Sequence, residues 1–215
     1  MRQHGSEVKW PGAPGESQEG RAPLPRSFYS REPVEVAREL IGKRLVRALD
    51  DAVLVSRIVE TEAYRGTGDA ASHASGGRTA RNAPMFGPPG HAYVYFIYGM
   101  HWMFNISAHP ADVPGAVLIR ALQPEVGIDT MRRLRNQSTG RLLTNGPAKL
   151  AQALAIDGTL NDLDLCAKGE LIVVTGSLQE GERIANGPRV RVPGGADAEQ
   201  RPWRFWIKDN PWVSS

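Results

Sequence analysis

The sequence predicts a single α+β domain, with a curved, mainly antiparallel β-sheet, surrounding helices and a protruding β-hairpin. Its 215 residues are enough for one domain with a substantial core. Short segments of alternating apolar and polar residues outnumber the segments with helical periodicity. These strand-like segments do not alternate regularly with helices, and this pattern favours α+β over a parallel α/β arrangement.

The amino-terminal residues differ in composition from the rest of the chain. Residues 1–26 mix Gly, Pro, Ser and both signs of charge with few apolar side chains. Because such a segment cannot bury enough apolar surface to fold, we expect a disordered tail, and a folded domain over residues 27–215. Folded structure should begin near Phe28, and a helix should run from Pro33 to a stop at Gly42.

The middle of the chain predicts two hairpins joined by a long loop. Strands 44–47 and 53–64 should pair around a turn at Asp50–Asp51. Residues 65–91 are rich in Gly and Pro, and a loop of this length inside a compact domain is usually functional. Strands 93–97 and 103–107 should form the second hairpin. Its tip carries bulky apolar side chains, which are unusual choices for a solvent-exposed turn.

The last third of the chain predicts more strands than helices. One helix should run from Pro124 to Arg135, and a second should start at Pro147, with Asn145 or Gly146 as its cap. The remaining predicted strands are 115–122, 171–174, 189–192 and 204–207. No internal repeat is visible.

Composition narrows the class of protein. The net charge is +3 and the isoelectric point is about 9.2, and only five of the 26 basic residues are lysines. Arginine suits contact with phosphate, although a coding bias toward arginine explains the composition equally well. The single cysteine excludes an intrachain disulfide and favours a reducing compartment. No apolar run approaches the roughly 20 residues that span a bilayer, and no secretory signal is visible, so neither a membrane nor secretion is expected.

Two carboxylates lie in the predicted strand 53–64. Because side chains alternate along a strand, Glu60, Glu62 and Tyr64 should share one face, while Val59 and Ala63 point to the core. Taken alone, such glutamates more often lie on a solvated strand face than act as general acid or base.

The tyrosines and the histidine that follow can likewise be interpreted either as site residues or as ordinary core and surface residues. Tyr93 and Tyr95 should share a face of their strand, but tyrosines in strands are more often core residues than a stacking platform. His73, in the long loop, is more often a surface or satisfied histidine than a site residue. The histidines have no cysteine or acidic partner at ligand spacing, so no metal and no cofactor are expected. Bulky apolar side chains at a hairpin tip, here Tyr98 and Met100, are typical of wedges inserted between DNA bases.

Taken together and in this order, seven segments resemble the alkyladenine (3-methyladenine) DNA glycosylase family, of the monofunctional mammalian and bacterial type. The segments are Arg57–Tyr64, Met85–Phe86, Tyr93–Met100, Asn105–Ser107, Ile119–Ala121, Gly146–Leu150 and Pro211–Ser214. The resemblance runs from about Phe28 to Ser214.

The resemblance implies a cofactor-free enzyme that flips damaged purines out of duplex DNA and hydrolyses the N-glycosidic bond. Implied substrates are 3-methyladenine, 7-methylguanine and hypoxanthine, and no lyase activity is implied. The implied roles are a catalytic base for Glu62, base binding for Tyr64, His73, Tyr95 and Asn105, intercalation for Tyr98 and Met100, and DNA-backbone contact for Arg78, Arg81, Arg120 and Lys149. The variable residues Met100–Trp102 leave the depth of insertion open.

Two other functions remain compatible with the residues alone. A non-catalytic nucleic-acid-binding β-module would use the same arginines and tyrosines without needing Glu62. A hydrolase of free nucleosides would need the carboxylate but no wedge. For a repair enzyme we expect double-stranded DNA as the partner and a monomeric state. We also expect an intracellular location, in the nucleoid or cytoplasm of a bacterium or in the nucleus of a eukaryote.

Overall fold

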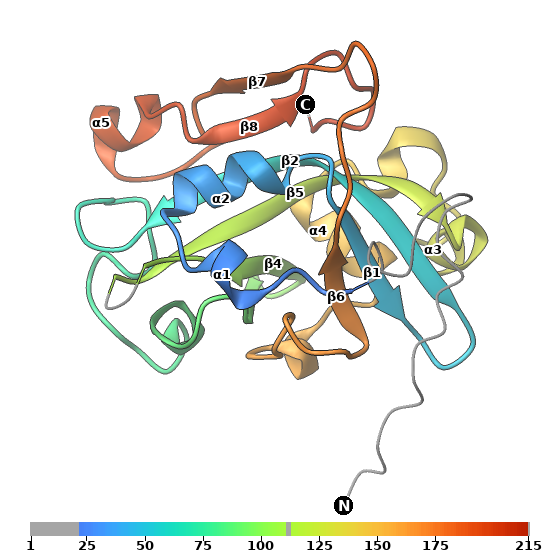
Figure 1. The fold of residues 1–215 in the computed structure, drawn as a ribbon, viewed down its shortest axis with the longest axis horizontal. Helices are drawn as coiled ribbons and strands as arrows, with labels where there is room; N and C mark the ends of the chain where they lie inside the picture. The colour runs from blue at the N-terminus through green and yellow to red at the C-terminus, as the bar shows by residue number, and fades with distance from the viewer. Residues whose placement is uncertain (1–21, 111–112, 215) are drawn as a thin grey trace, which may run out of the picture.

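The computed structural model describes residues 22–110 and 113–214, and they form an antiparallel sheet that curls around a core (Figure 1). The strands are β1 (Arg44–Ala48), β2 (Val53–Arg65), β3 (Ala92–Ile97), β4 (His101–Ser107), β5 (Gly115–Val126), β6 (Leu171–Val174), β7 (Ile184–Gly187) and β8 (Arg204–Ile207). Their main order is β3-β4-β5-β2-β1-β6, and the β7–β8 hairpin joins through β8 to β2. The predicted α+β class is confirmed.

The strand β2 is the centre of this arrangement. On one side it pairs with β5 along nearly its whole length, and on the other it pairs first with β1 and then with β8. The register between β2 and β5 shifts on either side of Glu60, so that Val59 on β2 and Arg120 on β5 have no opposite partner. Bulges of this kind re-aim side chains, and here they bring Arg120 to the same side as Glu60.

The predicted alternation along β2 is confirmed. Val59 and Ala63 are fully buried in the main core. Thr61, on the same face, donates its hydroxyl hydrogen bond to Ala37 O in α2 (Pro33–Leu40). This helix lies in front of β2 and β5 in Figure 1. Glu60 and Glu62 therefore point to the opposite side.

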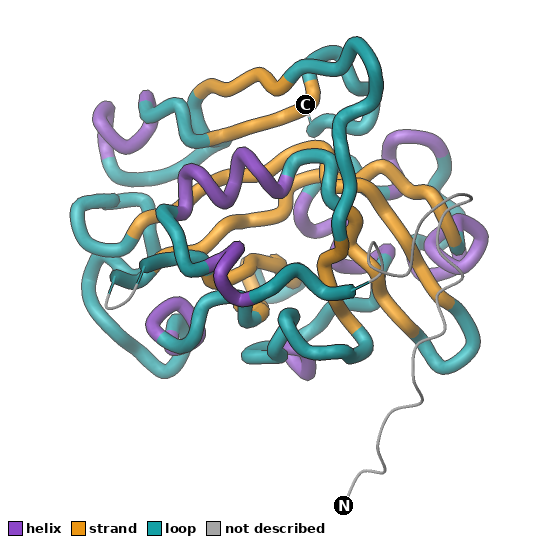
Figure 2. Tube along the Cα trace, viewed as in Figure 1, coloured by secondary structure: helices purple, strands orange, loops and turns teal. Residues whose placement is uncertain are grey.

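The helices are short. Besides α2 they are α1 (Arg26–Tyr29), α3 (Ile128–Leu134), α4 (Pro147–Ala153) and α5 (Gly195–Gln200). Both α2 and α4 pack against strands of the sheet. The described part of the chain also has 3-10 turns at Ala83–Phe86, Gly140–Leu143 and Gly158–Leu160. Pro147 is the first residue of α4, as predicted, and Gly146 takes the cap position. Figure 2 shows the connection between β2 and β3 as loop with one short helical turn, close to the predicted long loop.

Packed structure begins somewhat before Phe28. Leu24 is buried, and its N–H donates to Val173 O at 2.8 Å, so this residue extends the edge of β6. Most of the predicted tail, residues 1–21, lies outside the described residues.

Two predictions about secondary structure were wrong. Pro124 does not open a helix, because β5 continues to Val126 and pairs Pro124 with Ser56. Gly127, with a φ of 77°, then turns the chain into α3. The segment 189–192 is not a strand, because its ladder position beside β8 is taken by β7.

Candidate active site

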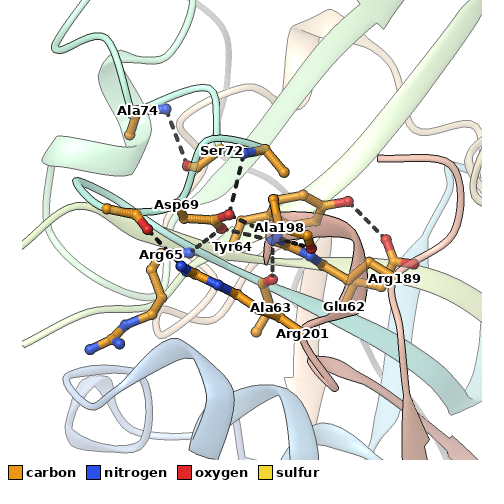
Figure 3. Close-up of polar contacts among 12 residues, drawn as sticks. Glu62, Ala63, Tyr64, Arg65, Asp69, Ser72, Ala74, Arg189, Ala198 and Arg201 are labelled. Carbon is orange, nitrogen blue, oxygen red and sulfur yellow. Dashed lines mark hydrogen bonds and ion pairs between the residues drawn. The ribbon is translucent and has the colours of Figure 1, made fainter. Parts of the chain in front are cut away.

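The carboxylate of Glu62 is fully buried on β2, at 0% exposure, so the solvated-face interpretation was wrong. Its Oε2 accepts the hydroxyl of Tyr64 at 2.8 Å (Figure 3), and its Oε1 accepts the backbone N–H of Val190 at 2.6 Å. Nη1 of Arg120 lies 3.3 Å from the same Oε1. Three donors therefore hold one carboxylate in a fixed orientation, and two of them lie on Oε1.

The neighbouring Glu60, also at 0% exposure, is more completely engaged. Its Oε1 accepts from Nε of Arg204 at 2.7 Å and from Nε of Arg120 at 3.0 Å. Ser214 donates its hydroxyl to Oε1 at 2.9 Å and its backbone N–H to Oε2 at 2.7 Å. With four donors, Glu60 is suited to holding Arg120 and the carboxyl-terminal segment, and less suited to activating a water molecule.

Arg120 joins the two carboxylates. Burial lowers the pKa of its guanidinium, but the carboxylates of Glu62 and Glu60 outweigh burial and raise the pKa above its usual value. Arg120 is therefore a permanent cation beside Glu62. Its side chain is only 9% exposed, so any contact it makes with DNA is restricted to the cavity that it lines.

A cavity of about 570 Å³ lies in front of this group. Its walls include predicted site residues from β2, the long loop, the β3–β4 hairpin, β5 and α4: Tyr64, His73, Tyr95, Tyr98, Asn105, Arg120 and Lys149. Val190 and Ser214 also line it, and both contact the glutamates behind the wall. The volume suits a small flat molecule. The structure therefore brings all four predicted base-binding residues together around one space.

Aromatic side chains form one wall. The rings of His73 and Tyr95 are 4.7 Å apart between centroids, and those of Tyr93 and Tyr95 are 5.1 Å apart. Burial raises the pKa of Tyr95 to about 12, and burial together with the positive charge of Arg81 lowers that of His73. The Tyr93 hydroxyl lies 2.8 Å from Nδ1 of His73. Both partners are neutral near pH 7, so this wall is uncharged and can stack on a flat base.

Tyr93 was not among the predicted site residues, although its place on the same strand face as Tyr95 was a usable signal. It also helps to fix Asn105, whose Nδ2 donates to Tyr93 O at 3.1 Å. Asn105 is buried and lines the cavity.

The hairpin tip projects into solvent beside the cavity. Tyr98 is 81% exposed and Met100 is 66% exposed. Tyr98 and Gly99 have φ of 54° and 68°, and the N–H of Met100 donates to Ile97 O, as in a two-residue hairpin turn. A tyrosine with positive φ is uncommon, and here the turn presents its ring outward. Met100 does not line the cavity.

The predicted phosphate-contacting side chains are in different situations. Arg78 is exposed and makes no hydrogen bond or ion pair within the described residues. Nη2 of Arg81 instead donates to Phe96 O, and its guanidinium lies over the ring of Tyr95. Nζ of Lys149 donates to Asn145 Oδ1 at 2.8 Å. Burial and the nearby Arg135 and Arg141 lower the pKa of Lys149.

The described residues contain neither a cluster of metal ligands nor a membrane-spanning helix. Within residues 22–110 and 113–214, no three His, Cys, Asp or Glu side chains gather as metal ligands would. No helix in that part of the chain is long and apolar enough to cross a bilayer.

The sequence is similar to proteins that carry a functional description. A family model described as "Methylpurine-DNA glycosylase (MPG)" matches residues 27–211. A protein of Methanocella arvoryzae named "Putative 3-methyladenine DNA glycosylase" is 48% identical over 192 residues, which are 89% of this chain and 95% of that protein. Proteins with the same name from Carboxydothermus hydrogenoformans and Burkholderia lata are 47% and 43% identical, covering 89% and 100% of this chain and 98% and 97% of their own lengths.

Proposed function

This chain belongs to the methylpurine-DNA glycosylase family, and we propose that it excises damaged purines by means of a water molecule activated by Glu62. The enzyme is a 3-methyladenine DNA glycosylase, an N-glycosylase of base-excision repair that acts on alkylated purines in DNA. The proposed substrates are 3-methyladenine, 7-methylguanine and hypoxanthine in double-stranded DNA. The proposed products are the free base and an intact abasic site, without strand cleavage.

One observation carries the proposal. Glu62 is a buried carboxylate directly behind an aromatic-lined cavity, and Tyr64 both donates to it and forms part of the cavity wall. A base stacked against this wall would place its sugar near the carboxylate. Alkylation gives the purine a positive charge, which the faces of Tyr64 and Tyr95 attract and which weakens the glycosidic bond.

The proposed reaction is hydrolysis at C1′ of the sugar. The glycosidic bond breaks, and its electron pair leaves with the base. Water oxygen bonds to C1′, and Glu62 takes the proton that water loses. The carboxylate also stabilises the positive charge that develops on the sugar. Arg120 and the N–H of Val190 fix the carboxylate so that it needs little rearrangement in this step.

Flipping is proposed to use the exposed hairpin tip. Removing a base from the stack costs a few kcal/mol, and less when the base is damaged or mispaired. The ring of Tyr98 is exposed beside the cavity and could fill the space that the base leaves. Arg78, and Lys149 at the cavity edge, are the proposed phosphate contacts.

The test is single-turnover excision from duplexes that carry one 3-methyladenine, 7-methylguanine or hypoxanthine. The proposal expects release of the base from duplex DNA and none from the free nucleosides. Equal activity on free nucleosides would favour a nucleoside hydrolase, and tight duplex binding without any release would favour a non-catalytic module.

Three further properties belong to the proposal. We expect a monomer, whose excision rate per molecule does not change with protein concentration at saturation. We expect excision to be unchanged in EDTA, because we assign no step to a metal. We also expect that borohydride traps no covalent adduct with DNA, although Lys149 is an amine on the cavity wall.

A further inference from the structure

A second buried ion pair lies next to the Glu62 group, and no step of the proposed reaction uses it. Asp69, in the loop after β2, and Arg189, after β7, are both 0% exposed in their side chains. Nη1 and Nη2 of Arg189 donate to the two oxygens of Asp69 at 2.7 and 2.8 Å (Figure 3). A bidentate pair of this kind fixes both distance and orientation.

Asp69 connects the ion pair to the loop that carries His73. Besides Arg189, the carboxylate of Asp69 accepts the backbone N–H groups of Arg65 at 3.1 Å and Ala71 at 3.3 Å. The turn continues when the N–H of Ser72 donates to Asp69 O at 2.9 Å. The next residue is His73, on the aromatic wall. Asp69 thus sets the path of the loop between the end of β2 and that wall.

Arg189 connects the ion pair to β2. Nη1 of Arg189 also donates to Ala63 O at 3.1 Å, between Glu62 and Tyr64 in the sequence. The guanidinium lies 4.8 Å from the centroid of the Tyr64 ring, on the side chain that donates to Glu62. Nη2 donates to Ala198 O at 3.1 Å, which connects the short helix α5 to the same guanidinium.

Arg189 also precedes Val190, whose N–H holds Oε1 of Glu62 at 2.6 Å. The described structure places residues 188–193 outside the strands, so no sheet ladder fixes this N–H. The side chain of Arg189 is the anchor one residue away. A buried ion pair gains little stability over an apolar replacement, because both charges lose their hydration. A role in fixing geometry therefore explains this pair better than a role in stability.

We propose that Asp69 and Arg189 are positioning residues for excision, which hold the Val190 N–H, Tyr64 and the His73 loop in place around Glu62. Neither residue lines the cavity, and both act through other residues. The inference rests on the proposed function, because it assigns the pair to the step in which Glu62 acts.

The test compares two substitutions of the same kind. Arg189→Lys keeps the charge but cannot make the bidentate contact. Arg57→Lys is the matched control, because Arg57 lies on β2 and is a buried arginine that makes a bidentate pair, with the partly buried Glu182 at 2.6 and 3.0 Å. Neither Arg57 nor Glu182 lines the cavity. Single-turnover excision of hypoxanthine, duplex affinity and thermal unfolding are measured for both variants.

We expect Arg189→Lys to lower the excision rate at least about 10-fold, and Arg57→Lys to change it less than about 2-fold, at temperatures where both are folded. Duplex affinity should change less than about 3-fold in both variants. The two substitutions should not be additive in their effects on the excision rate, because Arg189 is proposed to act through Glu62. When Arg189→Lys is added to Glu62→Gln, the remaining excision rate should therefore fall less than about 2-fold.

Several results would overturn the inference. They are unchanged excision by Arg189→Lys, equal losses in the two lysine variants, or a full 10-fold loss that persists in the Glu62→Gln background. If Arg189→Lys does not fold, Asp69→Asn takes its place with the same expected outcomes, and failure of both variants to fold at 25 °C would assign the pair to stability alone. Wild-type protein that releases no lesion would instead contradict the proposed function.

Discussion

The hydroxyl of Tyr64 donates a hydrogen bond to Oε2 of Glu62, two residues earlier on the same strand, at 2.8 Å. Because side chains two apart on a strand share a face, this contact needs no change in the path of β2. Tyr64 therefore has two roles in the proposed reaction. Its ring is part of the cavity wall, and its hydroxyl orients the carboxylate.

These two roles can be separated with Tyr64→Phe, which keeps the ring and removes the hydroxyl. Loss of a hydrogen bond worth about 1 kcal/mol should lower single-turnover excision about five-fold. Duplex affinity should remain, because the stacking surface is unchanged. Tyr64→Ala, which also removes the ring, should weaken lesion binding as well. A Tyr64→Phe variant with weakened binding and normal excision would reverse this division of roles.

The hairpin wedge predicts a dependence on how well the lesion is paired. Tyr98→Ala should slow excision most for a well-paired lesion, where flipping is most costly, and least for a lesion in a mismatch. Val126→Ala is the control, because Val126 is also exposed, at 42%, but lies at the far end of β5. Excision rates are compared for hypoxanthine in both pairing contexts. Equal losses in the two contexts would exclude the wedge role.

Arg78 and Arg81 should differ in their effects. Arg78 is exposed, so Arg78→Ala should lower the slope of log affinity against log salt by about 1 without changing the excision rate at saturation. Arg81→Ala should also slow excision, because Arg81 contacts Phe96 O and the ring of Tyr95. Binding is measured by fluorescence anisotropy over a series of salt concentrations. A salt slope unchanged by Arg78→Ala would remove it from the phosphate contacts.

The lowered pKa of His73 predicts a pH effect that depends on lesion charge. Burial and Arg81 keep the imidazole neutral at pH 7, and it gains a proton only below its usual pKa of about 6.5. Below that pH, the imidazolium should disfavour a cationic base such as 7-methylguanine relative to neutral hypoxanthine. The ratio of the affinity for 7-methylguanine to the affinity for hypoxanthine should therefore decrease as the pH is lowered in the wild type. In His73→Phe this ratio should stay constant. A parallel fall in both proteins would assign the effect to another group.

The lowered pKa of His73 also makes the stability of the fold depend on pH, in the same direction. Because the folded pKa of His73 is lowered, the unfolded chain binds the proton more readily. The contribution of His73 to stability is therefore fully present above about pH 6.5 and is lost as pH falls toward the folded pKa. His73→Phe should reduce the acid sensitivity of the melting temperature in this window.

Local patterns predicted much of the fold. Alternation correctly placed Val59 and Ala63 in the core, and turn residues correctly placed both hairpins. The prediction of a helix from Pro124 was wrong because a sheet partner, Ser56, extends β5 past the proline. That partner is 68 positions away in the chain, and no local preference of proline reports it.

The sequence could predict the site only where side chains form it, and not where backbone groups do. The strand pattern identified Glu62 and Tyr64 as neighbours, but not that the carboxylate is completely buried. Val190 contributes a backbone N–H, which every residue except proline has and which therefore leaves no sequence signal. The Asp69–Arg189 pair joins residues 120 positions apart, and its geometry depends on the whole fold.

The difference between the two glutamates is the central claim. Glu62→Gln keeps the shape of the side chain but cannot take a proton, whereas Glu60→Gln disturbs a carboxylate that four donors already occupy. Glu60→Gln should lower the free energy of unfolding by more than about 1 kcal/mol, because its donors lose an ionised acceptor. Its excision loss should be the smaller of the two.

The most direct measurement is the single-turnover excision rate of hypoxanthine from a saturated duplex by Glu62→Gln, beside Glu60→Gln at the same temperature. We predict that Glu62→Gln loses at least about 100-fold in the chemical step, in the usual range for a general base, while it still binds the lesion duplex. A near wild-type rate for Glu62→Gln would contradict the account. If Glu60→Gln alone abolished excision, the roles of the two carboxylates would be reversed.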